Sequence, residues 1–217
     1  MKVKYKLTLG FAVVVSFIWI VGISAIIVSK NNLENTIRQY SAASLTRITN
    51  YVDDEINSKI EYFLGRTKGA TLQKTLKESN QKASMSHNFE QNISKIDRAW
   101  MRIPKDSVTP LMRSLLENDL SKSFRAEIKV FEKEYGEKLI SEILATDSSG
   151  ILVSQTTKAS DYYQGDELWW QKAKDERVYL TEFTFDESSG KYAMEVCVKI
   201  EDYNGKFIGI MKAVFEL

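Results

Sequence analysis

The sequence predicts an α+β protein, in which an N-terminal transmembrane helix and a long helical stalk precede an antiparallel sheet of about five strands flanked by helices. Three observations support this fold class. Close to its N-terminus the chain has a long run of residues without a charge. Apolar residues then recur three or four positions apart between residues 33 and 131. Beyond residue 138 the spacing changes to that of short strands separated by turns rich in Asp and Gly.

The uncharged run, residues 7–29, has the length of a transmembrane helix. At about 1.5 Å of rise per residue, its 23 residues can cross a hydrocarbon core roughly 30 Å thick. A cleaved signal peptide is the alternative. Its apolar core would be shorter, and the bulky stretch Ile26-Ile27-Val28 is unsuited to signal peptidase, so the sequence favours an uncleaved anchor.

The lysines around this run predict its orientation. Residues 1–6 contain three of them, Lys2, Lys4 and Lys6, whereas Lys30 is the one cation close behind the run. This excess of positive charge predicts cytoplasmic residues 1–6 and an extracytoplasmic remainder. The expected location is therefore the inner (plasma) membrane, with a single N-terminal span.

Residues 30–80 form the predicted stalk, a long helix with one apolar stripe. The stripe consists of Leu33, Ile37, Tyr40, Leu45, Ile48, Val52, Ile56, Ile60 and Leu64. Such a stripe either packs along its own domain or pairs with a second copy in a parallel coiled coil, and we expect a homodimer through this helix. The acidic run Asp53-Asp54-Glu55 points in three directions on a helix, so it predicts a solvated face and not a metal site.

A helical half follows, residues 81–137. Gly65 and Gly69 weaken the stalk helix, and the polar stretch Glu78–Ser86 predicts a turn. One further helix is expected to end near Ile103-Pro104. Another is expected to begin after Ser107, to run as one piece past Phe131 and to end at a Gly136 cap.

The remaining segment, residues 138–217, is rich in predicted strands. The strands are expected at 139–146, 151–155, 178–185, 192–200 and 207–216. A short helix, Glu167–Lys174, is expected between the second and third of them. The turns at 147–150 and 202–205 join neighbouring strands as antiparallel hairpins.

Composition excludes several classes of function. Lys and Arg number 30 against 29 for Asp and Glu, so no basic field indicates a nucleic-acid partner. One cysteine, Cys197, excludes an internal disulfide and is expected to be an inert core residue. The one histidine, His87, has no metal-ligating residue at suitable spacing. No catalytic triad, phosphate-binding loop or cofactor motif is present, so we expect neither an enzyme nor a bound cofactor or metal.

The strand-rich half resembles a known family. Its ordered elements are Asp147-x-x-Gly150, Ser160-Asp161-Tyr162, Asp166-Glu167-x-Trp169-Trp170-x-x-Ala173, Tyr179, Asp186-x-x-x-Gly190, Asp202-x-Asn204-Gly205 and Gly209. This set resembles a Cache domain, the extracytoplasmic PAS-like sensor of microbial histidine kinases, chemoreceptors and cyclic-dinucleotide enzymes. The resemblance covers residues 139–217 and, in outline, the helical segment before them. It implies a PAS-like five-stranded sheet and a ligand held beneath the loop and short helix of residues 162–173.

The resemblance also implies candidate ligand-binding residues. These are Tyr162, Tyr163, Glu167, Trp169, Trp170, Phe185 and Lys212. The neighbouring tryptophans diverge by about 100° on a helix, so one is expected in the core and the other in the cleft. Lys212 either faces the pocket and holds an anion or reaches water from the end of the sheet.

Two departures from the family pattern weaken the case for an amino-acid ligand. Glu167 stands where the amino-acid-binding members have an arginine, and Val214 stands where they have an aspartate. Both charged anchors of an amino acid are therefore missing.

These observations predict the extracytoplasmic ligand-sensing region of a membrane signal-transduction receptor, which binds a small molecule and passes the change to the stalk. The alternative is a membrane-anchored structural or interaction protein that uses the stalk helix and binds no ligand. A cavity of a few hundred Å³ with convergent polar groups favours the sensor. A completely filled core favours the structural role.

Overall fold

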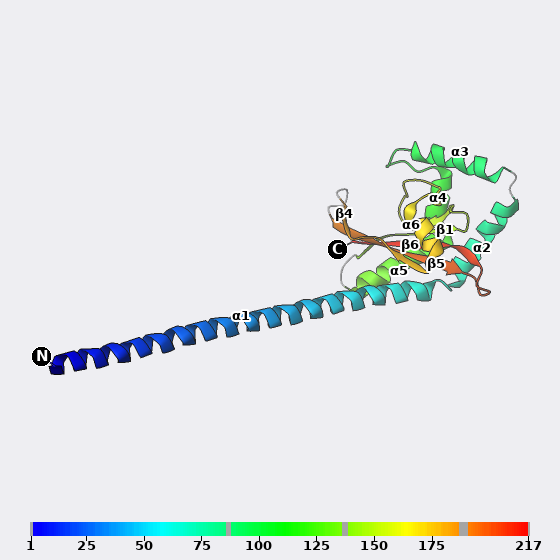
Figure 1. The fold of residues 1–217 in the computed structure, drawn as a ribbon. Coiled ribbons are helices and arrows are strands. Elements are labelled where there is room, and N and C mark those ends of the chain that lie inside the picture. The colour runs from blue at the N-terminus through cyan, green and yellow to red at the C-terminus, as the bar shows by residue number, and fades with distance from the viewer. Residues whose placement is uncertain (1, 86–87, 136–138, 187–190, 217) are drawn as a thin grey trace. The chain divides into compact units, whose positions relative to one another are not determined.

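A computed structural model describes residues 2–85, 88–135, 139–186 and 191–216. His87 and the predicted cap Gly136 lie outside these residues. The described chain is α+β, as predicted, with six helices and one antiparallel sheet (Figure 1). It divides into two compact units between Asn57 and Ser58, and helix α1 (Lys2–Arg66) contributes to both.

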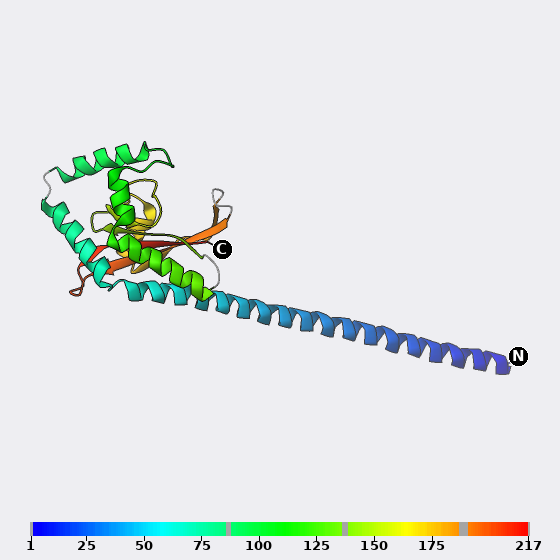
Figure 2. The same cartoon turned by 180° about the vertical axis from the view of Figure 1, so that it is seen from behind.

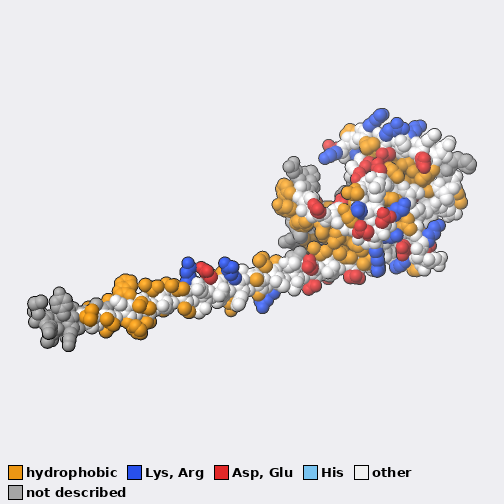
Figure 3. Space-filling model, in the orientation of Figure 1, with side chains coloured by type: hydrophobic (Ala, Val, Ile, Leu, Met, Phe, Trp, Pro, Cys, Tyr) orange, Lys and Arg blue, Asp and Glu red, His pale blue; other side chains and the backbone are white. Residues whose placement is uncertain are grey.

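The first unit is entirely helical. Within the described residues, α1 is the one helix that is long and apolar enough to cross a membrane. Its apolar side chains between Leu9 and Val28 gather along the helix surface and are exposed (Figure 3). The predicted stripe from Leu33 to Ile48 is exposed as well. This unit therefore has apolar surface with no partner within the unit.

The second unit holds the remaining helices and the sheet. The helices are α2 (Ala70–Met85), α3 (Phe89–Met101), α4 (Pro110–Glu117), α5 (Asp119–Tyr135) and α6 (Leu168–Asp175). The strands are β1 (Ile140–Asp147), β2 (Leu152–Gln155), β3 (Val178–Leu180), β4 (Thr184–Asp186), β5 (Lys191–Glu201) and β6 (Phe207–Glu216). Their order is β2-β1-β6-β5-β3, with β4 also paired to β5, and all pairs are antiparallel. The sheet thus has about five strands across, as predicted.

Two predictions about the helices were wrong. The stretch Glu78–Ser86 was expected to turn, but α2 continues to Met85. Polar residues of this stretch find partners in the sheet: Ser79 donates to Asp147, and Asn80 donates to the Ile208 carbonyl, each at 2.7 Å. Tertiary contacts therefore outweigh a low helix propensity here.

The helix expected after Ser107 is two helices, because Asn118 interrupts it in an extended conformation. The Asn118 side chain accepts a hydrogen bond from the Ser121 amide at 2.9 Å, which caps α5, and donates to the Val153 carbonyl at 2.9 Å. Thr109 caps α4 in the same manner, and Pro110 occupies the first helical position, where no amide donor is needed. The strand expected at 178–185 is likewise interrupted, since β3 and β4 are separate.

Helices cover both faces of the sheet. Figure 1 shows α6 in front of the sheet, and Figure 2, from behind, shows α5 in front of it. On the α5 face, Phe63 of α1 packs against Phe131 of α5 and Phe215 of β6, with ring centroids 5.8–6.3 Å apart. On the α6 face, a second apolar cluster includes Trp100, Met112, Leu144, Trp169, Trp170, Cys197 and Ile210.

The turn between β1 and β2 is held by a buried carboxylate. Asp147 accepts hydrogen bonds from the amides of Ser149 (2.9 Å) and Ile151 (3.2 Å) as well as from Ser79. Burial raises the pKa of Asp147. Gly150 follows with φ 85°, a conformation that L side chains rarely adopt. A Cβ atom there would lie 2.4 Å from the Gly165 Cα.

These two constraints on Gly150 give a stability test. We expect Gly150→Ala to lower the free energy of unfolding by more than about 2 kcal/mol, because backbone strain and a steric clash combine. The control is Gly205→Ala: Gly205 has φ 78° but open space around its Cβ position. It should cost about 1 kcal/mol, from strain alone. Urea unfolding followed by tryptophan fluorescence measures both, and equal losses would contradict the packing at Gly150.

Candidate functional site

Side-chain alternation on β6 brings two of the predicted site residues together on the α6 face of the sheet. Lys212 is paired in register with Leu144 of β1 and Cys197 of β5. Its Nζ lies 3.0 Å from the Glu195 Oε1 and 4.6 Å from the ring centroid of Trp169. Lys212 is 9% exposed, so it neither reaches bulk water nor has its charge free for an anion. Its amine forms an ion pair and a cation–π contact at once.

Both tryptophans of α6 are buried, which differs from the expectation that one of them lines the cleft. Trp169 is 7% exposed and Trp170 is 5% exposed. The Trp170 Nε1 donates to the Thr146 hydroxyl at 2.8 Å, and its ring meets Phe207 edge to face. The indoles therefore fill the middle of this face and close it to a ligand there.

The tyrosines precede α6 and are held by one carboxylate of α3. Asp97 accepts hydrogen bonds from the backbone amides of Tyr162 and Tyr163, each at 2.9 Å. The Tyr162 ring lies 5.6 Å from that of Trp100, and burial raises the pKa of its phenol to about 12. Tyr163 forms an isolated bridge with Ile151 and is half-buried. Both tyrosines thus have structural contacts.

The other two candidates are exposed. Glu167 is the N-cap residue of α6, and its side chain makes no capping hydrogen bond. Phe185 of β4 is 53% exposed and packs edge to face against Tyr192, which in turn stacks on Phe183. The seven candidates therefore do not line one common cleft.

A pocket does open at one end of the α6 face, and we call it the glutamate pocket. Its volume is about 670 Å³. It is lined by Ser141, Glu142, Thr157, Thr181, Glu182, Thr184, Ala193, Glu195, Val214 and Glu216. Val214, which occupies the position of the family's aspartate, is paired in register with both Glu142 and Glu195. Carboxylates thus flank this position from β1 and from β5.

The charges in the glutamate pocket are only partly balanced. Glu195 is paired with Lys212, and Glu216 is paired with Lys191 at 3.2 Å. Glu182 is exposed and has no ion pair within the described residues. Burial raises the pKa of Glu142, and the nearby Lys212 opposes this shift. The Glu142 Oε1 is buried and has no hydrogen-bond partner in the described chain, although a buried acceptor is normally paired.

Sequence analysis missed these glutamates because each follows the alternation of an ordinary strand. Glu142, Glu195 and Val214 come from three different strands, and the register that aligns them is a property of the folded sheet. Two signals were available: charged residues at inward positions of strands β1 and β5, and a lysine at an inward position of β6.

The described residues around the pocket can be compared with the requirements of a metal site and of a nucleophile. Among the described residues, no group of three or more His, Cys, Asp or Glu side chains could hold a metal ion. Cys197 is buried beside Lys212 and Trp169, and burial raises the pKa of its thiol. A thiol with a raised pKa is a poor nucleophile. The arrangement is suited to binding.

Comparisons with known proteins return sensory domains. No protein-family model and no curated protein matches the chain. Solved structures that it resembles are ligand-binding domains of receptors. One is from the Pseudomonas aeruginosa PAO1 amino acid chemoreceptor PctC, in complex with GABA (14% identity, 72% of this chain, 61% of that chain, TM-score 0.33). Another is from the Campylobacter jejuni chemoreceptor Tlp3, in complex with 4-methylisoleucine (15% identity, 69% and 62%, TM-score 0.33).

A third is the ligand-binding domain of Mlp24 with asparagine (18% identity, 76% and 60%, TM-score 0.31). The chain therefore spans about three-fifths of the length of these structures. They are sensory ligand-binding domains of receptors.

Because Lys212 is buried in its ion pair with Glu195, we expect removal of Lys212 to destabilise the fold more than removal of the exposed Lys191. Lys212→Ala leaves the Glu142 and Glu195 carboxyls without their cation, so it should lower the free energy of unfolding by about 2–3 kcal/mol. The control is Lys191→Ala, because the Lys191 side chain is 47% exposed in its pair with Glu216. It should cost less than about 1 kcal/mol. Urea unfolding measures both, and a Lys212→Ala loss as small as the control's would refute the role of the pair.

Proposed function

We propose that this chain is the sensory region of a membrane signal-transduction receptor, anchored by the apolar part of α1 and binding a small molecule in the glutamate pocket. The observation that carries the proposal is the pocket itself. The pocket has a volume of about 670 Å³ and is lined by polar side chains from the strands on both sides of β6. One of these side chains, Glu142, has a buried oxygen without a hydrogen-bond partner in the described chain. Pockets of this size with convergent polar groups are typical of small-molecule sites.

The lining indicates the chemistry of the ligand. Carboxyls and hydroxyls dominate it, and no lysine or arginine is among the described residues that line it. The nearest cation of β6, Lys212, is already paired with Glu195. A carboxylate ligand would meet like charges there, whereas an amine or another donor-rich cation would find acceptors. We therefore propose a small cationic ligand and not an amino acid.

The signal would pass from the pocket face of β6 to its opposite face, which contacts α1. Val214 lines the pocket on one face of the strand, and the next residue, Phe215, lies on the other. The Phe215 ring meets Phe63 in the last turns of α1 with centroids 5.8 Å apart. Beside it, Tyr62 and Arg66 of α1 both contact Glu127 of α5. Ligand binding that moves Val214 would thus shift the packing of α1, with a coupling of about 1–3 kcal/mol.

The stalk offers a place for a second copy. The stripe from Leu33 to Ile48 is exposed within its own unit, and we propose that it pairs with the same stripe of another chain, as in a parallel coiled coil. This pairing also suits the alternative function, a membrane-anchored structural protein without a ligand. The two functions differ in the pocket, because a structural role does not require an opening of this size.

Binding of a cationic probe tests the proposed ligand class. We expect the full chain to bind spermidine measurably in isothermal titration calorimetry, and Glu182→Lys to weaken this binding about tenfold, since Glu182 lines the pocket, is exposed and has no ion pair among the described residues. The control is Glu176→Lys at the exposed end of α6, outside the pocket. It carries the same change of charge and should leave the affinity unchanged. Equal weakening by both variants would indicate a general electrostatic effect and refute the site.

Membrane topology tests the anchor. We expect alkaline phosphatase fused after residue 216 to be active in a bacterial host, because the enzyme requires export and the lysines before the apolar run retain residues 1–6 in the cytoplasm. Replacing Lys2, Lys4 and Lys6 with glutamine should lower the activity. An inactive fusion to the unchanged sequence would place the sheet on the cytoplasmic side and contradict a sensor of external ligands.

A further inference from the structure

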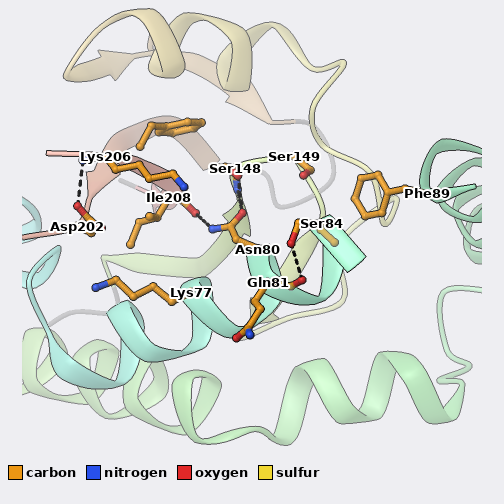
Figure 4. A pocket seen from close by; sticks show the side chains of 12 residues that line it. Lys77, Asn80, Gln81, Ser84, Phe89, Ser148, Ser149, Asp202, Lys206 and Ile208 are labelled. Carbon is orange, nitrogen blue, oxygen red and sulfur yellow. Dashed lines mark hydrogen bonds between the residues drawn. The ribbon is translucent and has the colours of Figure 1, made fainter. Parts of the chain in front are cut away.

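A second hollow lies away from the glutamate pocket, where α2 meets two turns of the sheet (Figure 4). We call it the lysine pocket. Its volume is about 620 Å³. Its lining includes Lys77 and Asn80 of α2, Ser148 of the β1–β2 turn, and Asp202 and Lys206 of the β5–β6 turn.

The wall of the lysine pocket is fixed by Asn80. Its Nδ2 donates to the Ile208 carbonyl, and its Oδ1 accepts from the Ser148 amide at 3.0 Å and from the Ser148 hydroxyl. One side chain thus joins α2 to the β1–β2 turn and to strand β6. Figure 4 shows these contacts, with Lys206 extending across the hollow toward Ser148. These intrachain hydrogen bonds hold the wall of the pocket in place, and a preorganised wall lowers the entropic cost of binding.

The described lining of this pocket has a net positive charge, because it holds two lysines, Lys77 and Lys206, and one carboxylate, Asp202. Asp202 accepts hydrogen bonds from the amides of Asn204 (2.8 Å) and Lys206 (3.0 Å), and these bonds lower its pKa, so it is ionised and engaged in the turn. Lys77 lies over the Tyr203 ring at 5.4 Å. Neither Lys77 nor Lys206 has a carboxylate within ion-pair distance in the described part of the chain.

An apolar pocket adjoins the lysine pocket. Its volume is about 670 Å³, and the two hollows share Ala83 and Phe89. Its lining is mainly apolar and includes Ile93, Ile96, Ala99, Ile151 and Tyr162. Two more lysines, Lys82 and Lys95, border it. The one carboxyl among its described lining residues, Asp147, is fully buried and bonded to Ser79 and to backbone amides.

We infer that the two hollows form one site for an organic anion with an apolar body, such as an aryl-substituted carboxylate. The apolar body of the ligand lies over Ile93 and Ile96 in the apolar pocket. Its carboxylate lies in the lysine pocket and accepts hydrogen bonds from Lys206 and from neighbouring polar groups of that pocket. Charge selects the ligand class: four lysines border the joined hollows, and both aspartates are engaged in turns. This site is independent of the glutamate pocket, whose lining favours the opposite charge.

Calorimetry with a matched pair of probes tests this inference. The full chain in phosphatidylcholine nanodiscs is titrated with 4-phenylbutyrate and with its uncharged amide, and heats from empty nanodiscs are subtracted. We expect the acid to bind about tenfold more tightly than the amide, as one charge-assisted contact provides. Lys206→Gln should abolish this difference and leave the affinity for the amide unchanged. Ile96→Ser should weaken the binding of both probes.

The control is Lys74→Gln. Lys74 lies on α2 like Lys77, but it is exposed, paired with Glu78 and absent from both hollows. It should leave both affinities unchanged. Equal binding of acid and amide to the unaltered chain, absence of binding, or an unchanged preference in Lys206→Gln would each overturn the inference. Spermidine binding at the glutamate pocket should be the same in Lys206→Gln, so failure here is distinguishable from failure there.

Discussion

The alternation of side chains along β6 positions both the glutamate pocket and the packing of the end of α1. Val214 and Lys212 lie on one face of this strand, and Phe215 lies on the other. The first face has an ion pair with Glu195, the indole of Trp169 and the border of the glutamate pocket. The second face contributes to the aromatic cluster that anchors the end of α1. A strand paired on both sides cannot slip by one residue without exchanging these faces. The register of β6 therefore fixes the glutamate pocket and the aromatic cluster at the end of α1 at the same time.

The sequence was sufficient for elements whose signal is local. Hydrophobic run length predicted a helix able to cross a membrane, and the Asp147–Gly150 and Asp202–Gly205 turns predicted the hairpins that order the sheet. It was insufficient where distant partners decide. Helix α2 continues through a polar stretch because Ser79 and Asn80 bond to a turn about seventy positions away. Asn118 divides a helix whose apolar stripe is continuous, because its amide reaches Val153.

In the candidate site, too, the sequence predicted the local features and missed those that depend on contacts between distant residues. The segment around α6 was identified by its resemblance to ligand-binding sensors, yet its tryptophans fill the middle of the sheet face and leave the opening at one end. Three strands bring Glu142, Val214 and Glu195 into one row, and no sequence spacing indicates that row. The loss of both charged anchors of an amino acid was visible in the sequence. The folded chain adds a physical reason for a different ligand. Glu142 and Glu195 flank Val214, and the nearby Lys212 is already ion-paired with Glu195.

Native mass spectrometry of the full chain, purified from a bacterial membrane, can detect a small molecule held in the glutamate pocket. We expect a bound molecule of defined mass with a basic group, and we expect it to be absent from a Val214→Phe variant, whose added ring fills the pocket. A chain that carries no small molecule and acquires none from a cell extract would rule out a ligand site there. A bound mass that persists unchanged in Val214→Phe would do the same.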